Sequence, residues 1–172
     1  MKLHRYNNFS YLNESMTDIT YHGTYVKRLE NILKTDTLNL TPTLGNRSDN
    51  YKNIDKDYFF STQRTKGLTG YISKSGVNVI LELDRRKLNH NFKSVPVDYF
   101  DGLLDIPEHE DRLVGNKDEI SNFSKYILSI HILYNDKYNY STIIKLTDKL
   151  GIPLYIYTNE RDSHPCRRRY YY

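Results

Sequence analysis

The sequence has little cysteine and no long apolar run. Cys166 is the only cysteine among 172 residues, which excludes a disulfide within the chain and a zinc site built from several cysteines. No apolar run approaches the roughly 18 residues that a membrane-spanning helix needs, and residues 1–10 lack the apolar core of a secretory signal. We therefore expect an intracellular, cytoplasmic protein with no membrane partner.

Internal repeats, low-complexity segments and linkers rich in Pro, Gly and Ser are also missing from the sequence. A chain of this length without such boundaries is about one domain long. We expect an N-terminal arm over residues 1–15, one domain over residues 16–160, and a basic, Tyr-rich tail over residues 161–172.

The charge balance is mildly basic, with 25 Lys and Arg against 21 Asp and Glu and a net charge of +4. Such an excess attracts polyanions without requiring one. In the tail, Arg167 to Arg169 precede Tyr170 to Tyr172, a combination that suits phosphate and base contacts but also a solvated chain end. Charge alone therefore leaves the partner open.

Hydrophobic spacing predicts more strands than helices. Strands are expected within residues 18–24, 57–64, 76–84, 125–134 and 152–158. The alternation in residues 77–83 is that of a strand central in a sheet, whereas residues 40–56 and 85–100 look like loops, the latter with short extended pieces. With helices mainly near the two ends, this pattern indicates an α+β fold.

Two helices are expected from apolar residues at helical spacing. One covers residues 25–36 with Thr24 as its N-cap, and the other begins at a Ser141 cap and ends at Gly151. In the first helix, the side chains expected to share a buried face are Val26, Leu29, Ile32 and Leu33.

The first candidate site is the run Tyr21-His22-Gly23-Thr24, where a strand end meets a helix start. A histidine and a flexible backbone position would project at the same edge of the sheet. A tight turn that needs glycine would also explain Gly23. A second histidine, His131, lies amid apolar residues and is expected to be a structural residue of the core or of a sheet edge.

The second candidate site follows Phe60, where we expect a strand to end. Ser61, Thr62 and Arg64 come next, and two hydroxyls with a guanidinium can cradle a phosphate or a ribose. Ser and Thr are also ordinary turn residues. Tyr71, further along, would either stack on a planar ring or fill the core.

The third candidate site is the run "EHEDRL", residues 108–113. In an extended segment Glu108 and Glu110 share a face while His109 and Asp111 share the other, and we expect Asp111 and Arg112 to face away from a substrate. Two close carboxylates raise each other's pKa and suit a cationic ligand or transition state. A solvated acidic loop is the competing interpretation.

These three runs, in this order, resemble the ADP-ribosyltransferase superfamily, and in particular small ADP-ribosyltransferase-like proteins of bacteriophages and large DNA viruses. The resemblance covers roughly residues 20–132. It implies a single domain with a split, mostly antiparallel β core, NAD as a substrate, no metal, and transfer of ADP-ribose to a macromolecular acceptor, protein or nucleic acid.

The resemblance also implies residue roles. The NAD-binding set would be His22, Gly23, Thr24, Ser61, Thr62, Arg64 and Tyr71. Within it, His22 would contact a ribose hydroxyl and the Gly23 backbone would pair with the nicotinamide carboxamide. Arg64 would bind the pyrophosphate, while Ser61 and Thr62 would shape the pocket and orient the catalytic glutamate.

The catalytic residues implied by the resemblance are Glu110, Glu108 and His22. Glu110 would hold the ribose 2'-hydroxyl and stabilise the cation formed as nicotinamide leaves, and Glu108 would position or deprotonate the acceptor. In the superfamily, Glu-x-Glu usually accompanies a first-strand Arg rather than a His. The acceptor therefore stays open among arginine, another side chain, DNA, RNA and a small molecule.

Three other functions remain open. An RNA 2'-phosphotransferase of similar fold needs several arginines, for which Arg64 and Arg112 are the candidates. A non-catalytic nucleotide or nucleic-acid-binding module would use the basic tail with Arg85 and Arg86 as phosphate contacts. A nuclease would use Glu108, Glu110 and Asp111 as metal ligands, and would depend on divalent ions.

Overall fold

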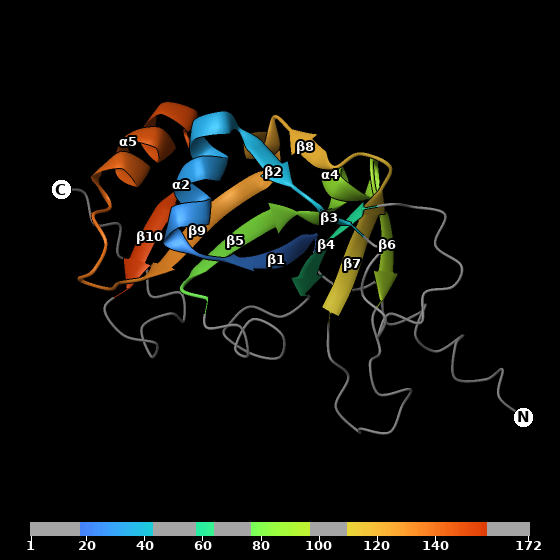
Figure 1. The fold of residues 1–172 in the computed structure, drawn as a ribbon, viewed down its shortest axis with the longest axis horizontal. Coiled ribbons are helices and arrows are strands. Elements are labelled where there is room, and N and C mark those ends of the chain that lie inside the picture. Colours follow the sequence, from blue (N-terminus) through green and yellow to red (C-terminus); the bar gives the residue numbers. More distant parts are fainter. Residues whose placement is uncertain (1–17, 43–57, 64–76, 97–109, 158–172) are drawn as a thin grey trace, which may run out of the picture.

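The computed structural model describes residues 18–42, 58–63, 77–96 and 110–157 (Figure 1). Eight strands form the larger sheet: β1 (Ile19–Thr24), β3 (Thr41–Pro42), β4 (Tyr58–Gln63), β5 (Val79–Asp84), β6 (Lys93–Pro96), β7 (Glu110–Gly115), β9 (Ile127–Leu133) and β10 (Leu154–Tyr157). Their order is β10-β9-β5-β1-β4-β7-β6, with β3 also paired to β4.

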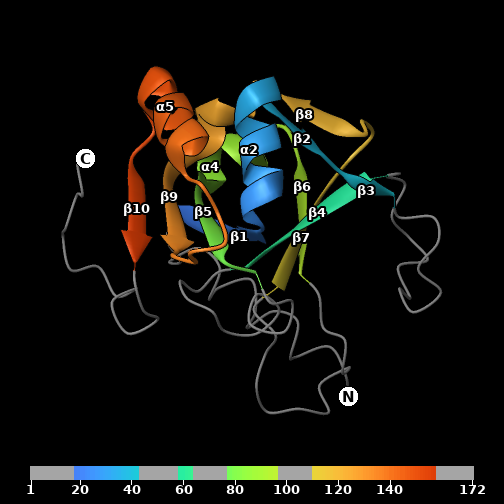
Figure 2. The ribbon, with the colours of Figure 1, turned by 60° about the vertical axis from the view of Figure 1, so that its left-hand side comes forward.

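Every pairing in this sheet is antiparallel except that of β9 with β10, which is parallel. Figure 2 shows the β10, β9 and β5 side of the sheet at the left and β4, β7 and β6 at the right. The mostly antiparallel α+β architecture expected from the sequence is confirmed in this coarse form.

The period-2 pattern of β5 decides which way its side chains point. Val79, Leu81 and Leu83 are fully buried in the main core, whereas Ile80 joins a second, smaller cluster with Tyr21. Antiparallel neighbours, β1 and β9, flank β5 on both edges. The prediction of a central strand here is confirmed.

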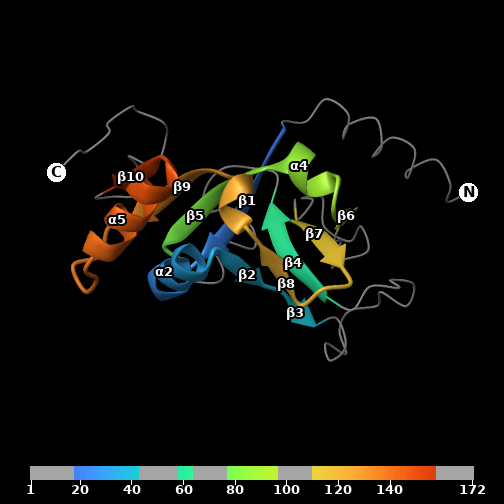
Figure 3. The ribbon, with the colours of Figure 1, turned by 90° about the horizontal axis from the view of Figure 1, so that it is seen from above.

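Two helices, α2 (Val26–Thr35) and α5 (Ser141–Leu150), pack against each other over one face of the sheet. Figure 3 shows them side by side from above. The predicted buried face of the first helix is confirmed, because Val26, Leu29, Ile32 and Leu33 are all buried. Within the described segments, no helix is long and apolar enough to cross a bilayer.

The predicted N-caps of these helices are wrong. Tyr25 and Tyr140 occupy the cap positions, and neither makes a side-chain capping hydrogen bond. Thr24 is still part of β1 and is buried, while Ser141 is the first helical residue and is exposed. The predicted end of α5 is confirmed, since Gly151 adopts a left-handed φ of 68° that glycine tolerates without strain.

The segment after β5, expected to be a loop with extended pieces, begins with a short helix, α4 (Arg85–Asn89). The Asp84 carboxylate accepts a hydrogen bond from the Lys87 backbone N–H at 3.0 Å and so caps this helix. β6 is the extended piece that follows. The cap fixes the backbone at Arg85, the first residue of the helix.

A small second sheet pairs β2 (Thr37–Asn39) with β8 (Glu119–Ser121), and the 3-10 helix η1 (Phe123–Tyr126) follows β8. Asp36 connects the end of α2 to η1 through hydrogen bonds. Its left-handed backbone ends α2, its carbonyl accepts from the Phe123 N–H at 3.0 Å, and its carboxylate accepts from the Ser124 N–H at 2.7 Å and hydroxyl at 3.0 Å.

Candidate active site on strands β1, β4 and β7

The three candidate runs lie on three neighbouring strands. His22 is on β1, Ser61 and Thr62 are on β4, and Glu110 is the first residue of β7. These strands are consecutive in the sheet, in the order β1-β4-β7. Segments far apart in the sequence are therefore brought to one part of the molecule (Figure 1).

The pairing of β1 with β4 is short. Tyr21 and Gln63 are the one register pair between these strands, whereas all six residues of β1 pair with β5. A side-chain bond supplements it, because the Thr20 hydroxyl donates to the Gln63 carbonyl at 3.1 Å. Beyond Tyr21 the link is made by a side chain, that of His22.

His22 reaches across to β4 through its imidazole. Nδ1 lies 2.8 Å from the Ser61 carbonyl oxygen, and because a carbonyl can only accept, the proton of the neutral ring belongs on Nδ1. The lone pair on Nε2 is then an acceptor. The ring also meets the Phe60 ring edge to face, with centroids 5.8 Å apart.

The electrostatics of this site keep His22 neutral. Burial lowers its pKa from the ordinary value of 6.5, the Ser61 carbonyl opposes that shift, and the positive charge of Arg28 on α2 adds to it. The net direction is downward, so the ring is uncharged at pH 7. A neutral imidazole with a fixed tautomer can accept a hydrogen bond from a hydroxyl.

Gly23 lies inside β1 and pairs with Ile80 of β5. It is buried and is not among the residues of positive φ, so the tight turn that would have explained this glycine is absent. A glycine within a strand often marks a place where a ligand or another backbone approaches closely. Thr24 follows it, buried and opposite Val79.

Ser61 and Thr62 lie within β4, which continues to Gln63, and not after its end as predicted. Thr62 is buried, and its hydroxyl donates to the Asp111 carbonyl of β7 at 3.1 Å. Thr62 therefore does not form a phosphate cradle at a strand end. Its hydroxyl holds β7 beside β4.

On β7, Asp111 and Arg112 are both buried, although charged residues seldom are unless paired. The Asp111 carboxylate accepts from the Arg85 guanidinium at 3.2 Å. The Arg112 guanidinium carbon lies 4.4 Å from the centre of the Phe59 ring. Neither side chain belongs to a solvated acidic loop.

These contacts bear on two alternatives. Arg85, proposed as a phosphate contact, is half-buried and committed to Asp111, while Arg86 is exposed and paired with Asp18. The same pair occupies the carboxylate of Asp111, one of the three suggested metal ligands. In the segments that the structure describes, no three His, Cys, Asp or Glu side chains gather as metal ligands would.

The remaining predicted residues lie outside the described residues. They are Arg64, Tyr71, Glu108 and His109, together with the N-terminal arm and the C-terminal tail. For Glu110 the structure gives the backbone position alone: it opens β7 and pairs with Gln63.

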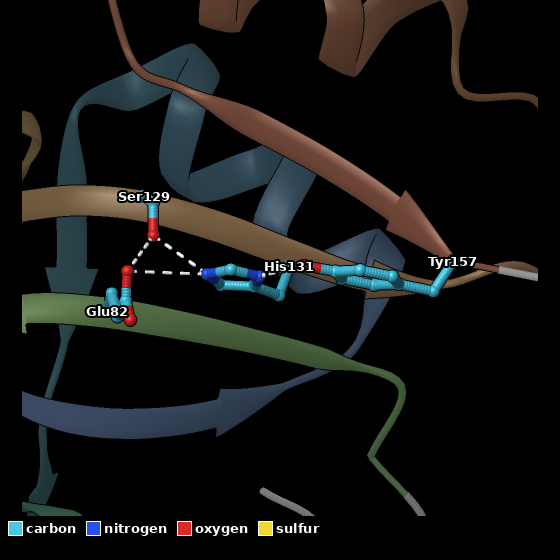
Figure 4. A network of polar contacts seen from close by, with 4 residues as sticks. All are labelled: Glu82, Ser129, His131 and Tyr157. Atoms are coloured by element: carbon cyan, nitrogen blue, oxygen red, sulfur yellow. Dashed lines mark hydrogen bonds and ion pairs between the residues drawn. The ribbon is translucent and has the colours of Figure 1, made fainter. Parts of the chain in front are cut away.

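A second polar group occupies strands β5, β9 and β10, and of its members sequence reasoning identified His131 alone (Figure 4). His131 Nε2 lies 2.8 Å from the Ser129 hydroxyl and 3.4 Å from a Glu82 carboxylate oxygen, and Ser129 also contacts that carboxylate. His131 Nδ1 lies 2.9 Å from the Tyr157 hydroxyl. Tyr155 stacks on the His131 ring with centroids 5.0 Å apart.

One arrangement of protons satisfies this whole network. Tyr157 donates to Nδ1, Nε2–H donates toward Ser129 and Glu82, and the Ser129 hydroxyl donates to the ionised Glu82. Burial, Tyr155 and Glu82 raise the pKa of Tyr157 to about 12, so its hydroxyl keeps the proton that this arrangement needs. Both nitrogens of His131 therefore have partners, as expected for a structural histidine.

A single row of register partners runs across the sheet, from this second polar group to the candidate site on β1, β4 and β7. Ser129, Glu82, Tyr21, Gln63 and Glu110 are successive partners across β9, β5, β1, β4 and β7. Every member is polar. Burial raises the pKa of Tyr21, and the negative charge of Glu82 adds to that shift.

The alternation of side chains between the two faces of β5 and β9 is a sequence signal that could have identified Glu82 and His131 as members of one polar face. It places Glu82 and His131 off the apolar face marked by Leu81 and Ile130. Only the strand order, however, shows that they are neighbours. No protein-family model and no curated protein matches this chain, so the site is described by its geometry alone.

Proposed function

We propose that this protein is an NAD-dependent ADP-ribosyltransferase. It would cleave the bond between nicotinamide and ribose and transfer ADP-ribose to a macromolecular acceptor, protein or nucleic acid. The observation that carries the proposal is the placement of the three runs on consecutive strands, with Tyr21, Gln63 and Glu110 in one register row.

The state of His22 supports this proposal. A neutral ring whose Nδ1–H is held by the Ser61 carbonyl leaves Nε2 to accept from a ribose hydroxyl. Within the described segments, the Nε2 atom of His22 has no hydrogen-bond partner, since the bond to Ser61 is made by Nδ1. Gly23, one residue further along β1, offers backbone without a side chain, which suits close approach by a planar carboxamide.

The chemistry assigned to Glu110 follows from the reaction. Loss of a positively charged nicotinamide leaves oxocarbenium character on the ribose, and a fixed carboxylate stabilises that charge more in the transition state than in the ground state. Thr62 supports this role, since its hydroxyl fixes the backbone of Asp111, the next residue.

The contacts of the arginines bear on the alternatives. A phosphotransferase needs guanidinium groups free to hold phosphate, whereas Arg112 is buried against Phe59. A phosphate-binding module that uses Arg85 would first have to break its ion pair with Asp111. The ADP-ribosyltransferase proposal requires neither arginine to change its contacts.

The decisive experiment is release of nicotinamide from NAD in the absence of added metal and with a chelator. The wild type should release nicotinamide, and Glu110→Gln should lower the rate about 100-fold or more, the loss typical of removing an electrostatic stabiliser. Glu119→Gln, at an exposed carboxylate of β8, is the matched control and should retain the wild-type rate.

Unchanged turnover in Glu110→Gln would contradict the assignment, and cleavage of nucleic acid that depends on a divalent ion, without release of nicotinamide, would favour a nuclease. The acceptor class needs a separate assay. Cell lysate incubated with tagged NAD and the protein is divided and digested with nuclease or with protease. Loss of the high-molecular-weight label in one arm identifies the acceptor as nucleic acid or protein.

A further inference from the structure

A largely shielded ion pair joins the first residue of α4, directly after β5, to the start of β7. The side chains of Arg85 and Asp111 are 14% and 3% exposed, and their polar atoms lie 3.2 Å apart. In the sheet, β1 and β4 separate β5 from β7. The pair thus joins two parts of the described sheet that no ladder of backbone hydrogen bonds connects directly.

Asp111 is held at two points. Its carboxylate is bound by Arg85, and its backbone carbonyl accepts from the Thr62 hydroxyl at 3.1 Å. Thr62 and Asp111 are themselves 1% and 2% exposed, so water does not compete readily for either bond. Glu110 is the adjacent residue, one peptide bond away.

The Arg85 end of the pair is also held in place. Arg85 is the first residue of α4, whose start is capped by Asp84, and its backbone N–H donates to the Asp18 carbonyl at 2.8 Å, just before β1. The guanidinium therefore extends from a fixed backbone. A displacement of β7 would pull the Asp111 carboxylate away from the Arg85 guanidinium, and separating two opposite charges that are largely shielded from water is strongly disfavoured.

We propose that Arg85 and Asp111 are a positioning pair, which fixes the start of β7 and with it the backbone of Glu110 for catalysis. The inference rests on the proposed function for its catalytic part. It goes beyond that function because the resemblance assigns no role to either residue. Neither side chain is required to touch NAD.

Kinetics separate positioning from mere stability. Displacing a catalytic group by about 1 Å can cost on the order of 100-fold in rate, so loss of the pair should lower kcat and leave the KM for NAD within about twofold. We expect kcat to fall tenfold or more in the near-isosteric Asp111→Asn and in Arg85→Gln, at temperatures where both are folded. Arg85→Lys keeps a cation and should recover most of the rate.

Arg86→Gln is the matched control, because Arg86 is the next residue of α4 and its pair with Asp18 is exposed. It should behave as the wild type. The proposal is overturned if Asp111→Asn keeps its kcat, if KM rises in place of the fall in kcat, or if Arg85→Lys is no better than Arg85→Gln.

Hydrogen exchange tests the same pair without NAD. In Asp111→Asn the backbone amides of residues 110–112 should exchange faster, while those of β9 keep their protection. Unchanged exchange at the start of β7 would refute the positioning role. If the wild type releases no nicotinamide, the proposed function fails, and exchange alone then decides whether the pair fixes β7.

Discussion

Two histidines of the sheet, the half-buried His22 and the buried His131, differ in how their rings are satisfied. His131 has partners on both nitrogens and a tyrosine stacked on its face, whereas His22 has a described partner at Nδ1 alone. A ring with both nitrogens occupied stabilises the fold, and one with a free acceptor can receive a ligand. The comparison teaches that the sheet separates a structural polar region from a candidate catalytic one.

The largest expected effect breaks the catalytic side of this comparison. His22→Ala removes the acceptor proposed for the ribose hydroxyl, and nicotinamide release should fall about 100-fold, the lower end of losses for a missing transition-state contact. The rate is compared per folded molecule, because the same change also removes the bond from Nδ1–H to the Ser61 carbonyl. A variant that kept the wild-type rate would place His22 with His131 as a structural residue.

The structural side of the comparison is tested by His131→Ala. This change removes the bonds of His131 to Tyr157, Ser129 and Glu82 while the contact between Ser129 and Glu82 remains, and a shielded polar group that loses a bond costs about 1–3 kcal/mol. We expect the free energy of unfolding, measured by urea denaturation, to fall by about 3 kcal/mol. The rate of nicotinamide release per folded molecule should stay near that of the wild type.

A smaller change removes a single hydrogen bond from the network. Tyr157→Phe deletes the hydroxyl that contacts His131 Nδ1 and should lower the free energy of unfolding by about 1 kcal/mol. Tyr155→Phe is the matched control, since Tyr155 meets the same ring by stacking. Equal losses in the two variants would show that the hydroxyl of Tyr157 makes no specific contribution.

The smallest expected effect is a difference in pH dependence. Because the folded-state pKa of His22 lies below its ordinary value of 6.5, the unfolded chain binds the proton more readily. This residue therefore makes stability fall as the pH drops below about 6.5, and the loss stops below the folded-state pKa. Urea denaturation at pH 5 and pH 7 should show a smaller difference for His22→Gln than for the wild type.

Much of the fold was predictable because its strands carry clear period-2 patterns. The burial of Val79, Leu81 and Leu83 follows from alternation, and α2 follows from helical spacing. The caps were not predictable from residue type, because Thr24 continues β1 and is buried there. Helix α4 is too short to show a helical period, although Asp84 gave the capping signal.

The candidate site was only partly predictable, for a different reason. Alternation can assign a side chain to a face, but it cannot say which strands become neighbours. The burial of Asp111 depends on Arg85, the first residue of α4, which follows β5 and so comes from beyond two intervening strands. The same applies to His131, whose partner Tyr157 comes from the parallel strand β10.

The strand order has a further consequence, for the rate of folding. No two antiparallel neighbours in the described sheet are joined by a tight hairpin, and the shortest connection between such neighbours runs from Pro96 to Glu110. The six-residue ladder between β1 and β5 can form only when residues 79–84 arrive from far along the chain. Bringing distant segments together costs chain entropy before their contacts stabilise the fold. We therefore expect folding over milliseconds to seconds, with the pairing of β1 and β5 as the slow step.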